Sequence, residues 1–201
     1  MPYLSTLRLF ACLLLGGAAS AQAELRTQVV DYSVGATRMT GYLAYDAAAG
    51  APRPGVLVVH EWWGHNDYAR KRAEMLAELG YVALALDMYG EGKVAEHPDN
   101  AKAFMQAIVS DMPEAERRFN AARELLQRQP NVDRERIAAV GYCFGGGIVL
   151  HMARIGTDLD AVVSYHGALA TQTPAAPGAV KARVLVFNGA DDAMVTAEQV
   201  E

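Results

Sequence analysis

One cysteine lies in a stretch whose glycine spacing suits a nucleophile. The sequence from Ala139 to Gly146 reads AVGYCFGG, so Cys143 has one glycine two positions before it and another two positions after it. A nucleophile raised on a sharp strand-to-helix turn has strained backbone dihedrals, and a side chain at either of those positions would collide with the turn. The pattern therefore predicts a reactive thiol at Cys143. The alternative is a glycine-rich turn that holds a buried, inert cysteine.

The residues after this turn are expected to activate the thiol. Ile148, Val149 and Met152 indicate a helix whose N-terminus points toward Cys143. The positive end of a helix dipole favours negative charge, so this helix is predicted to lower the pKa of the thiol and to stabilise an oxyanion.

Short apolar strands must position the turn. Strands that are buried on both faces contain few polar residues and belong to a parallel sheet covered by helices. Five such strands are predicted, at Gly55–His60, Val82–Leu86, Ile137–Val140, Ala161–Tyr165 and Val184–Phe187. Functional groups gather beyond the carboxyl ends of such strands, and Cys143 follows one of them.

Helices and a hairpin complete the predicted α/β fold. One predicted helix ends at Gly80, and a second runs from about Met112 to Gln129. Apolar residues on one face of the first helix are Ala69, Ala73, Leu76 and Leu79. Alternating apolar residues around Gly35 predict a leading antiparallel hairpin between Glu24 and Asp46. The expected fold is a mostly parallel sheet with helices on both faces.

The N-terminus has the pattern of a cleavable secretory signal. Residues 1–23 contain a basic residue, an apolar run and small residues that end at Ala23. The apolar run is shorter than the roughly 20 residues that span a bilayer, so no membrane anchor is expected after cleavage. We expect an exported protein, periplasmic or secreted, whose residues 24–201 form one domain. Cys12 would leave with the signal, so Cys143 would be the one cysteine of the mature chain.

The charge pattern and the last residues add two expectations. The formal net charge is −5 and the sequence has no basic run, so neither nucleic acid nor an anionic membrane surface is an expected partner. Thr196–Glu201 has the character of the first turn of a helix. The domain is therefore expected to be truncated at its C-terminus.

Three stretches together resemble the dienelactone hydrolase family of α/β-hydrolases. They are Ile137–Gly147, "HEWWGHND" at His60–Asp67 and "LDMYGEG" at Leu86–Gly92. The resemblance covers nearly all of the chain from about Leu25 onward. It implies an α/β-hydrolase fold, no cofactor, and a Cys-His-Asp triad that acts on a small-molecule lactone or ester. The oligomeric state stays open.

The resemblance implies a role for residues at two strand ends. Cys143 matches the nucleophile, and Glu61 matches a glutamate that accepts the thiol proton, because the thiolate is the attacking form. The backbone N–H groups of Phe144 and Trp62 would stabilise the oxyanion. The alternative for Glu61 is that it only accepts hydrogen bonds from loop amides.

The acid and the base of the triad are expected near and beyond the end of the sequence. Family spacing favours Asp192 as the acid and leaves Asp191 as the second candidate, while an Asp-rich turn is the structural alternative. The histidine would follow the acid by about 25 residues, given usual element lengths, which places it beyond Glu201. Of the five histidines present, His166 is the candidate substitute base.

No metal site is predicted from the other histidines. His60 and His65 are one residue too far apart to bind zinc from one helix face, and a strand-to-loop change separates them. His151 lies in the helix after the turn, where packing is its expected role.

The expected substrate pocket includes Tyr89, Glu91, Lys93 and Tyr142. In members of the resembled family that hydrolyse an anionic lactone, an arginine at the position of Glu91 holds the carboxylate of the substrate. A carboxylate at Glu91 repels such a ligand, and Lys93 is the nearby cation that could compensate. This departure leaves the class of activity in place and the substrate open.

Two other classes of function compete with the hydrolase. A catalytically silent binding protein with this fold would explain the absence of the expected histidine. A redox-responsive thiol protein would need an exposed cysteine with a lowered pKa.

Overall fold

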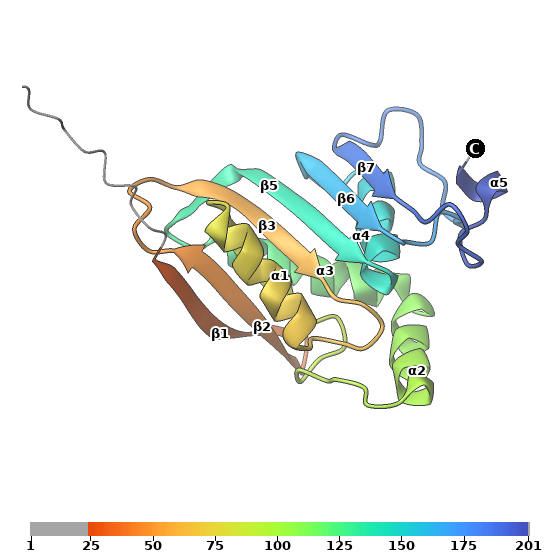
Figure 1. Cartoon of the computed structure of the whole chain (residues 1–201), viewed down its shortest axis with the longest axis horizontal. Helices are drawn as coiled ribbons and strands as arrows, with labels where there is room; N and C mark the ends of the chain where they lie inside the picture. Colours follow the sequence, from red (N-terminus) through yellow and green to blue (C-terminus); the bar gives the residue numbers. More distant parts are fainter. Residues whose placement is uncertain (1–23, 201) are drawn as a thin grey trace, which may run out of the picture.

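The computed structural model describes residues 24–200, which form one mixed sheet with helices on both faces (Figure 1). In chain order the elements are β1 (Leu25–Val34), β2 (Thr37–Asp46), β3 (Arg53–Val59), α1 (Asp67–Glu78), β4 (Val82–Leu86), α2 (Pro98–Val109), α3 (Met112–Gln127), β5 (Val132–Tyr142), α4 (Phe144–Arg154), β6 (Ala161–Tyr165), β7 (Arg183–Phe187) and α5 (Ala197–Val200). The seven strands are ordered β1-β2-β4-β3-β5-β6-β7.

The strand predictions are confirmed. β1 and β2 form the leading antiparallel hairpin, in which Val34 pairs with Thr37 around Gly35. β2 joins β4 in antiparallel register, and β4, β3, β5, β6 and β7 are parallel neighbours. β5 begins at Val132, earlier than the predicted Ile137. Its residues 133–136 are polar, pair only in part and lie largely at the surface, so no apolar run marks them in the sequence.

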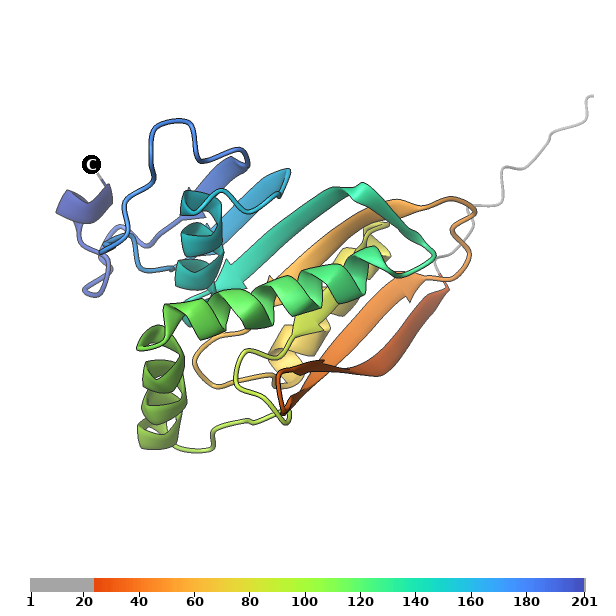
Figure 2. The same ribbon diagram turned by 180° about the vertical axis from the view of Figure 1, so that it is seen from behind.

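The two faces of the sheet bury different side chains. Figures 1 and 2 show α1 on one face and α3 and α4 on the other. Successive residues of a strand point to opposite faces, so Val56 and Val58 of β3 pack with Ala73 of α1. Leu57 and Val59 belong to the larger cluster under α3 and α4. The central strand β3 is therefore buried on both faces, as its apolar sequence predicts.

Two helices differ from the expectation. The buried residues of α1 are Ala69, Ala73 and Ala77. Leu79 follows the last helical residue and is 75% exposed, so its predicted place on the apolar face was wrong. α2 was not predicted, although Pro98 at its first turn and the buried Ala101 and Ile108 are helical signals. Only Ala101 and Ile108 of α2 are buried, so the apolar face of this helix is narrow.

The structure describes the helical turn predicted at the C-terminus and does not describe the predicted N-terminal signal. The predicted signal at residues 1–23 lies outside the described residues. α5 agrees with the helical turn predicted at Thr196–Glu201. Within residues 24–200, no helix is both long and apolar enough to cross a membrane.

Candidate active site

The turn between β5 and α4 has the strained geometry that its glycines predicted. Cys143 has φ 52° and ψ −111°, a conformation that non-glycine residues rarely adopt. A Cβ atom on Gly141 would lie 2.1 Å from the Gly145 carbonyl oxygen, and one on Gly145 would lie 2.3 Å from the Val59 carbonyl oxygen. Only glycine fits at either position, so the steric prediction is confirmed. The first turn of α4 thereby packs directly against the end of β3.

Parallel register brings the ends of β3, β5, β6 and β7 to the same edge of the sheet. Val59 of β3 is opposite Gly141 of β5, Tyr142 is opposite Tyr165 of β6, and Tyr165 is opposite Phe187 of β7. The residues that follow these strands therefore meet beside Cys143.

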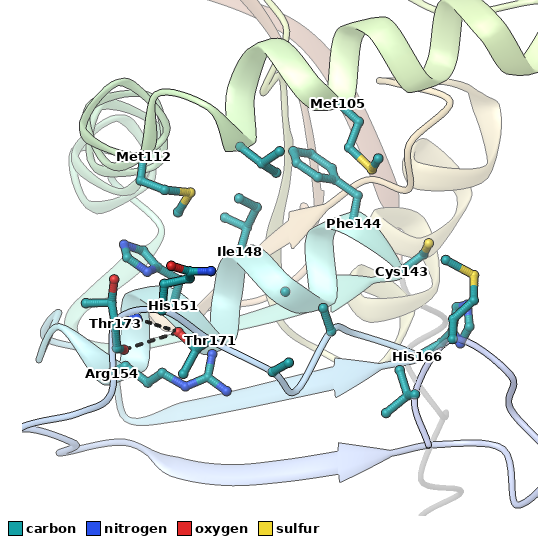
Figure 3. A pocket seen from close by; sticks show the side chains of 17 residues that line it. Met105, Met112, Cys143, Phe144, Ile148, His151, Arg154, His166, Thr171 and Thr173 are labelled. Carbon is teal, nitrogen blue, oxygen red and sulfur yellow. Dashed lines mark hydrogen bonds between the residues drawn. The ribbon is translucent and has the colours of Figure 1, made fainter. Parts of the chain in front are cut away.

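Cys143 lies on the wall shared by two cavities. The larger, of about 520 Å³, extends along α4 and is lined mainly by apolar side chains such as Met105, Met112 and Ile148 (Figure 3). We call it the apolar cavity. The smaller, of about 290 Å³, is the tyrosine cavity, lined by Glu61, Tyr68, Arg72, Tyr142, Cys143, Tyr165 and His166. Since His166 also lines both cavities, an imidazole and a thiol border the same space.

Aromatic rings form one side of the tyrosine cavity. The rings of Tyr142 and Tyr165 are stacked with centroids 5.3 Å apart, and Phe187 stacks on the far side of Tyr165 at 4.8 Å. The guanidinium of Arg72 lies over the rings of Tyr68 and Tyr142, at 4.9 and 5.3 Å from their centroids. This side of the tyrosine cavity is therefore aromatic and carries one guanidinium.

The two backbone N–H groups that were predicted to stabilise an oxyanion belong to Phe144 and Trp62. The Phe144 N–H is directed at the Cys143 sulfur and lowers the pKa of the thiol. The Trp62 N–H has no hydrogen-bond acceptor within residues 24–200. The carbonyl of Trp62 accepts a hydrogen bond of 2.9 Å from the Tyr89 hydroxyl, which fixes the peptide after β3.

The thiol is less acidic than the helix dipole alone predicted. Burial raises the pKa of Cys143, and the carboxylates of Glu61 and Asp192 raise it further against the effect of the Phe144 N–H. The expectation of a lowered pKa was therefore wrong. Burial and the two nearby carboxylates destabilise the thiolate more than the Phe144 N–H stabilises it.

The loop after β7 brings Asp192 to His166. One oxygen of Asp192 accepts hydrogen bonds from the N–H groups of Met194 at 2.8 Å and Val195 at 3.3 Å. The other oxygen pairs with Nδ1 of His166. The Met194 N–H is the main cause of the lowered pKa of Asp192, and His166 adds to it. Asp191 is exposed, so Asp192 is the carboxylate that faces the site.

His60 and Asp87 are structural parts of the site that the sequence reasoning missed. The Met88 N–H donates to Nε2 of His60 at 3.2 Å, so Nδ1 carries the proton and donates to the Glu61 carbonyl at 2.6 Å. Burial lowers the pKa of His60, which keeps the ring neutral. The carboxylate of Asp87 accepts from four backbone N–H groups, those of Thr40, Tyr89, Gly90 and Gly92. An acid directly after the buried β4 was the available signal.

The comparisons with known proteins agree with this geometry. The model of the dienelactone hydrolase family matches residues 39–201. The chain belongs to this family. The crystal structure of a dienelactone hydrolase-like promiscuous phosphotriesterase from metagenomic libraries is 39% identical with a TM-score of 0.81, over 88% of this chain and 73% of that chain. The fold is accordingly that of the α/β-hydrolases, as predicted.

Curated relatives extend the comparison. Protein usf of Aquifex pyrophilus is 31% identical over 145 residues, which are 70% of this chain and 61% of that protein. The carboxymethylenebutenolidase of Pseudomonas putida is 30% identical over 125 residues, which are 59% of this chain and 52% of that protein. The chain thus spans about three fifths of the length of the Aquifex pyrophilus relative.

In this dienelactone hydrolase family member, the predicted pocket residues lie in different places. Tyr142 lines the tyrosine cavity. Tyr89 is buried against His60, and Glu91 forms an exposed ion pair of 3.2 Å with Lys93. Tyr89, Glu91 and Lys93 line neither of the two cavities that Cys143 borders.

The remaining histidines have structural surroundings. His151 is buried, as predicted, and its Nε2 pairs with Glu116 at 2.8 Å. Burial lowers the pKa of His65 to about 4. Residues 24–200 contain no group of three His, Cys, Asp or Glu side chains placed to hold a metal ion.

Proposed function

We propose that this protein hydrolyses a lactone or small carboxylic ester, with Cys143 as the nucleophile. The strained turn at Cys143, on the wall common to both cavities, is the observation that carries the proposal. A sulfur in that position can attack a carbonyl whose acyl part lies in one cavity and whose leaving group lies in the other. Family membership supports the same class of reaction.

The chemistry proceeds through an acyl-thioester. The Cys143 sulfur attacks the carbonyl carbon, and the N–H groups of Phe144 and Trp62 stabilise the oxyanion. The C–O bond to the leaving alkoxide then breaks, and water hydrolyses the thioester. The raised pKa keeps the resting thiol protonated. A base must therefore take its proton, and Glu61, which borders the same cavity as the sulfur, is the proposed acceptor.

Asp192 orients the imidazole that protonates the leaving alkoxide and activates water. Among the described residues, His166 is the imidazole that pairs with Asp192. The family resemblance instead expects a histidine beyond Glu201. A His166→Asn variant separates the two: loss of turnover assigns the step to His166, and retained turnover assigns it to another histidine.

The decisive experiment measures turnover of p-nitrophenyl acetate and of dienelactone by the wild type and by Cys143→Ala. Removal of a nucleophile is expected to lower kcat by at least about 10³-fold. Mass spectrometry of the wild type, quenched during turnover, should find an acetyl group on the peptide that contains Cys143. Equal turnover by both proteins would contradict the proposal.

Negligible turnover by both proteins would favour a silent binding protein. The raised pKa of Cys143, which burial causes, counts against the redox alternative.

We also propose that the protein is exported and that its signal is cleaved after Ala23. The support is the sequence of residues 1–23. N-terminal sequencing of the protein from the periplasm or medium should begin at Glu24. Retention of Met1 in protein from the cytoplasm would contradict this proposal.

A further inference from the structure

The apolar cavity has a cationic end remote from the thiol. Figure 3 shows Cys143 and His166 at one end of the cavity and Arg154, Thr171 and Thr173 at the other. Of the described residues that line it, Arg154 is the only lysine or arginine, and none is an aspartate or glutamate. The cavity therefore combines apolar walls with one positive charge.

Helix α4 fixes the distance between the two ends. Its lining residues Phe144, Gly147, Ile148, His151 and Arg154 lie at positions i, i+3, i+4, i+7 and i+10 and so share one face of the helix. Arg154 comes 11 positions after Cys143, which corresponds to about 16 Å of helix rise. Side chains of a helix lean toward its N-terminus, so the guanidinium lies closer to the thiol than this figure.

Arg154 is held in place without a carboxylate partner. Its guanidinium donates to the Leu169 carbonyl at 2.9 Å, and within residues 24–200 no acid forms an ion pair with it. The neighbouring His151 already pairs with Glu116. Burial lowers the pKa of Arg154, because it removes part of the water around the charge. A bound anion would supply the missing partner.

The walls between the two ends suit an aliphatic chain. Met105, Val109, Met112 and Ile148 line this part of the cavity. Flexible methionine side chains adapt to chains of different length. The side chains of Thr171, Gln172 and Thr173 add polar atoms to the lining, and Figure 3 shows Thr171 and Thr173 at the end with Arg154.

We propose that the apolar cavity is the acyl subsite for monoesters of aliphatic dicarboxylic acids. The ester carbonyl lies at Cys143, the methylene chain follows the Ile148 face of α4, and the free carboxylate binds the guanidinium of Arg154. This inference rests on the proposed hydrolase function and adds its substrate class. The anion site is then at the end of α4, not at the position of Glu91, where the family resemblance expects an arginine.

A pair of esters of equal chain length tests the role of Arg154. The substrates are p-nitrophenyl hydrogen suberate, with a terminal carboxylate, and p-nitrophenyl octanoate, without one. Arg154→Met should lower kcat/KM for the suberate ester by about 10- to 100-fold, the effect of one lost charge-assisted contact. The octanoate value should hold or rise, because the methyl end of that chain would then meet an apolar side chain in place of a charged guanidinium. Arg154→Lys should retain part of the preference, because it keeps the charge and loses the planar guanidinium.

Arg128→Met is the matched control, since Arg128 is exposed and pairs with Glu124 on the surface of α3. It should leave both esters unaffected. Equal losses for both esters in Arg154→Met would mean that Arg154 only holds the loop at Leu169, and unchanged values for both would mean that the carboxylate binds elsewhere. Either result overturns the inference.

Binding without turnover separates this inference from the proposed function. Calorimetry with suberate and the Cys143→Ala protein should detect binding that weakens with salt and is lost in Cys143→Ala/Arg154→Met. Binding of suberate with no ester turnover would sink the hydrolase proposal and keep the subsite. Turnover of octanoate with no suberate binding would keep the hydrolase and sink the subsite.

Discussion

At the scale of the residue, the Cys143 thiol is controlled by its burial and by two carboxylates, those of Glu61 and Asp192. Because its pKa is raised by burial and by Glu61 and Asp192, the thiol should stay protonated at pH 7. We predict that iodoacetamide labels it slowly at pH 7. The pH at which the labelling rate is half-maximal should lie above that of an ordinary cysteine. The folded protein then binds more protons than the unfolded chain in this range, so its stability should fall as pH rises past the ordinary thiol pKa.

The carboxylate of Glu61 provides a second test at this scale. Glu61→Gln removes one negative charge beside the sulfur, so the midpoint of iodoacetamide labelling should move to lower pH. Glu116→Gln is the control, because Glu116 pairs with His151 and contributes nothing to the thiol pKa. An unchanged midpoint in Glu61→Gln would show that its charge does not reach the sulfur.

At the scale of the element, the packing of α4 on β3 depends on Gly145. The Cβ of Gly145→Ala would lie 2.3 Å from the Val59 carbonyl oxygen and 2.6 Å from that of His60. We predict a loss of about 2 kcal/mol or more in the free energy of unfolding by urea, because α4 must move away from β3. The oxyanion N–H of Phe144 would move with it, so turnover should fall as well.

Gly147 is the matched control on the same helix. The nearest atoms to its added Cβ belong to Ala168 at 3.8 Å, an ordinary contact. Gly147→Ala should therefore leave stability unchanged or raise it by up to about 1 kcal/mol, since alanine favours the helix. Equal stability of the two variants would refute the tight contact at Gly145.

The loop after β4 depends in the same way on Asp87. Asp87→Ala leaves the N–H groups of Thr40, Tyr89, Gly90 and Gly92 without their acceptor. We expect it to cost about 3 kcal/mol of unfolding free energy. Asp67→Ala, whose side chain is fully exposed in the first turn of α1, should change little. A small effect at Asp87 would mean that water replaces the carboxylate.

At the scale of the whole molecule, β7 is an apolar edge in the described chain. Val184, Leu185, Val186 and Phe187 are each between 39% and 51% exposed. An exposed apolar edge strand pairs readily with another chain, so we predict that a protein expressed as residues 24–201 associates with rising concentration in sedimentation velocity.

Leu185→Lys should weaken this association. Val29→Lys alters an equally exposed residue on β1, the opposite edge of the sheet, and should have no effect. A monomer at all concentrations, or equal effects of both variants, would contradict association through β7.

Local patterns in the sequence determined the strands, the hairpin and the turn at Cys143. Apolar runs such as Val82–Leu86 identify buried strands because a strand that is covered on both faces needs an apolar side chain at nearly every position. The glycines at 141 and 145 identify the turn because a Cβ atom at either position would clash with the backbone of the turn or of the end of β3. The family resemblance rests on the same local stretches, and the match to residues 39–201 confirms it.

Only the tertiary structure decided the electrostatics and the cavities. The pairing of His166 with Asp192 depends on two loops that follow different strands. The pKa of Cys143 rises because burial and acids from two other loops outweigh the hydrogen bond from the Phe144 N–H, and no local pattern in the sequence contains all of these effects. Arg154 becomes a candidate anion site because α4 and the loop at Leu169 enclose it together. Each of these depends on the distances between side chains far apart in the sequence, which exist only after the chain has folded.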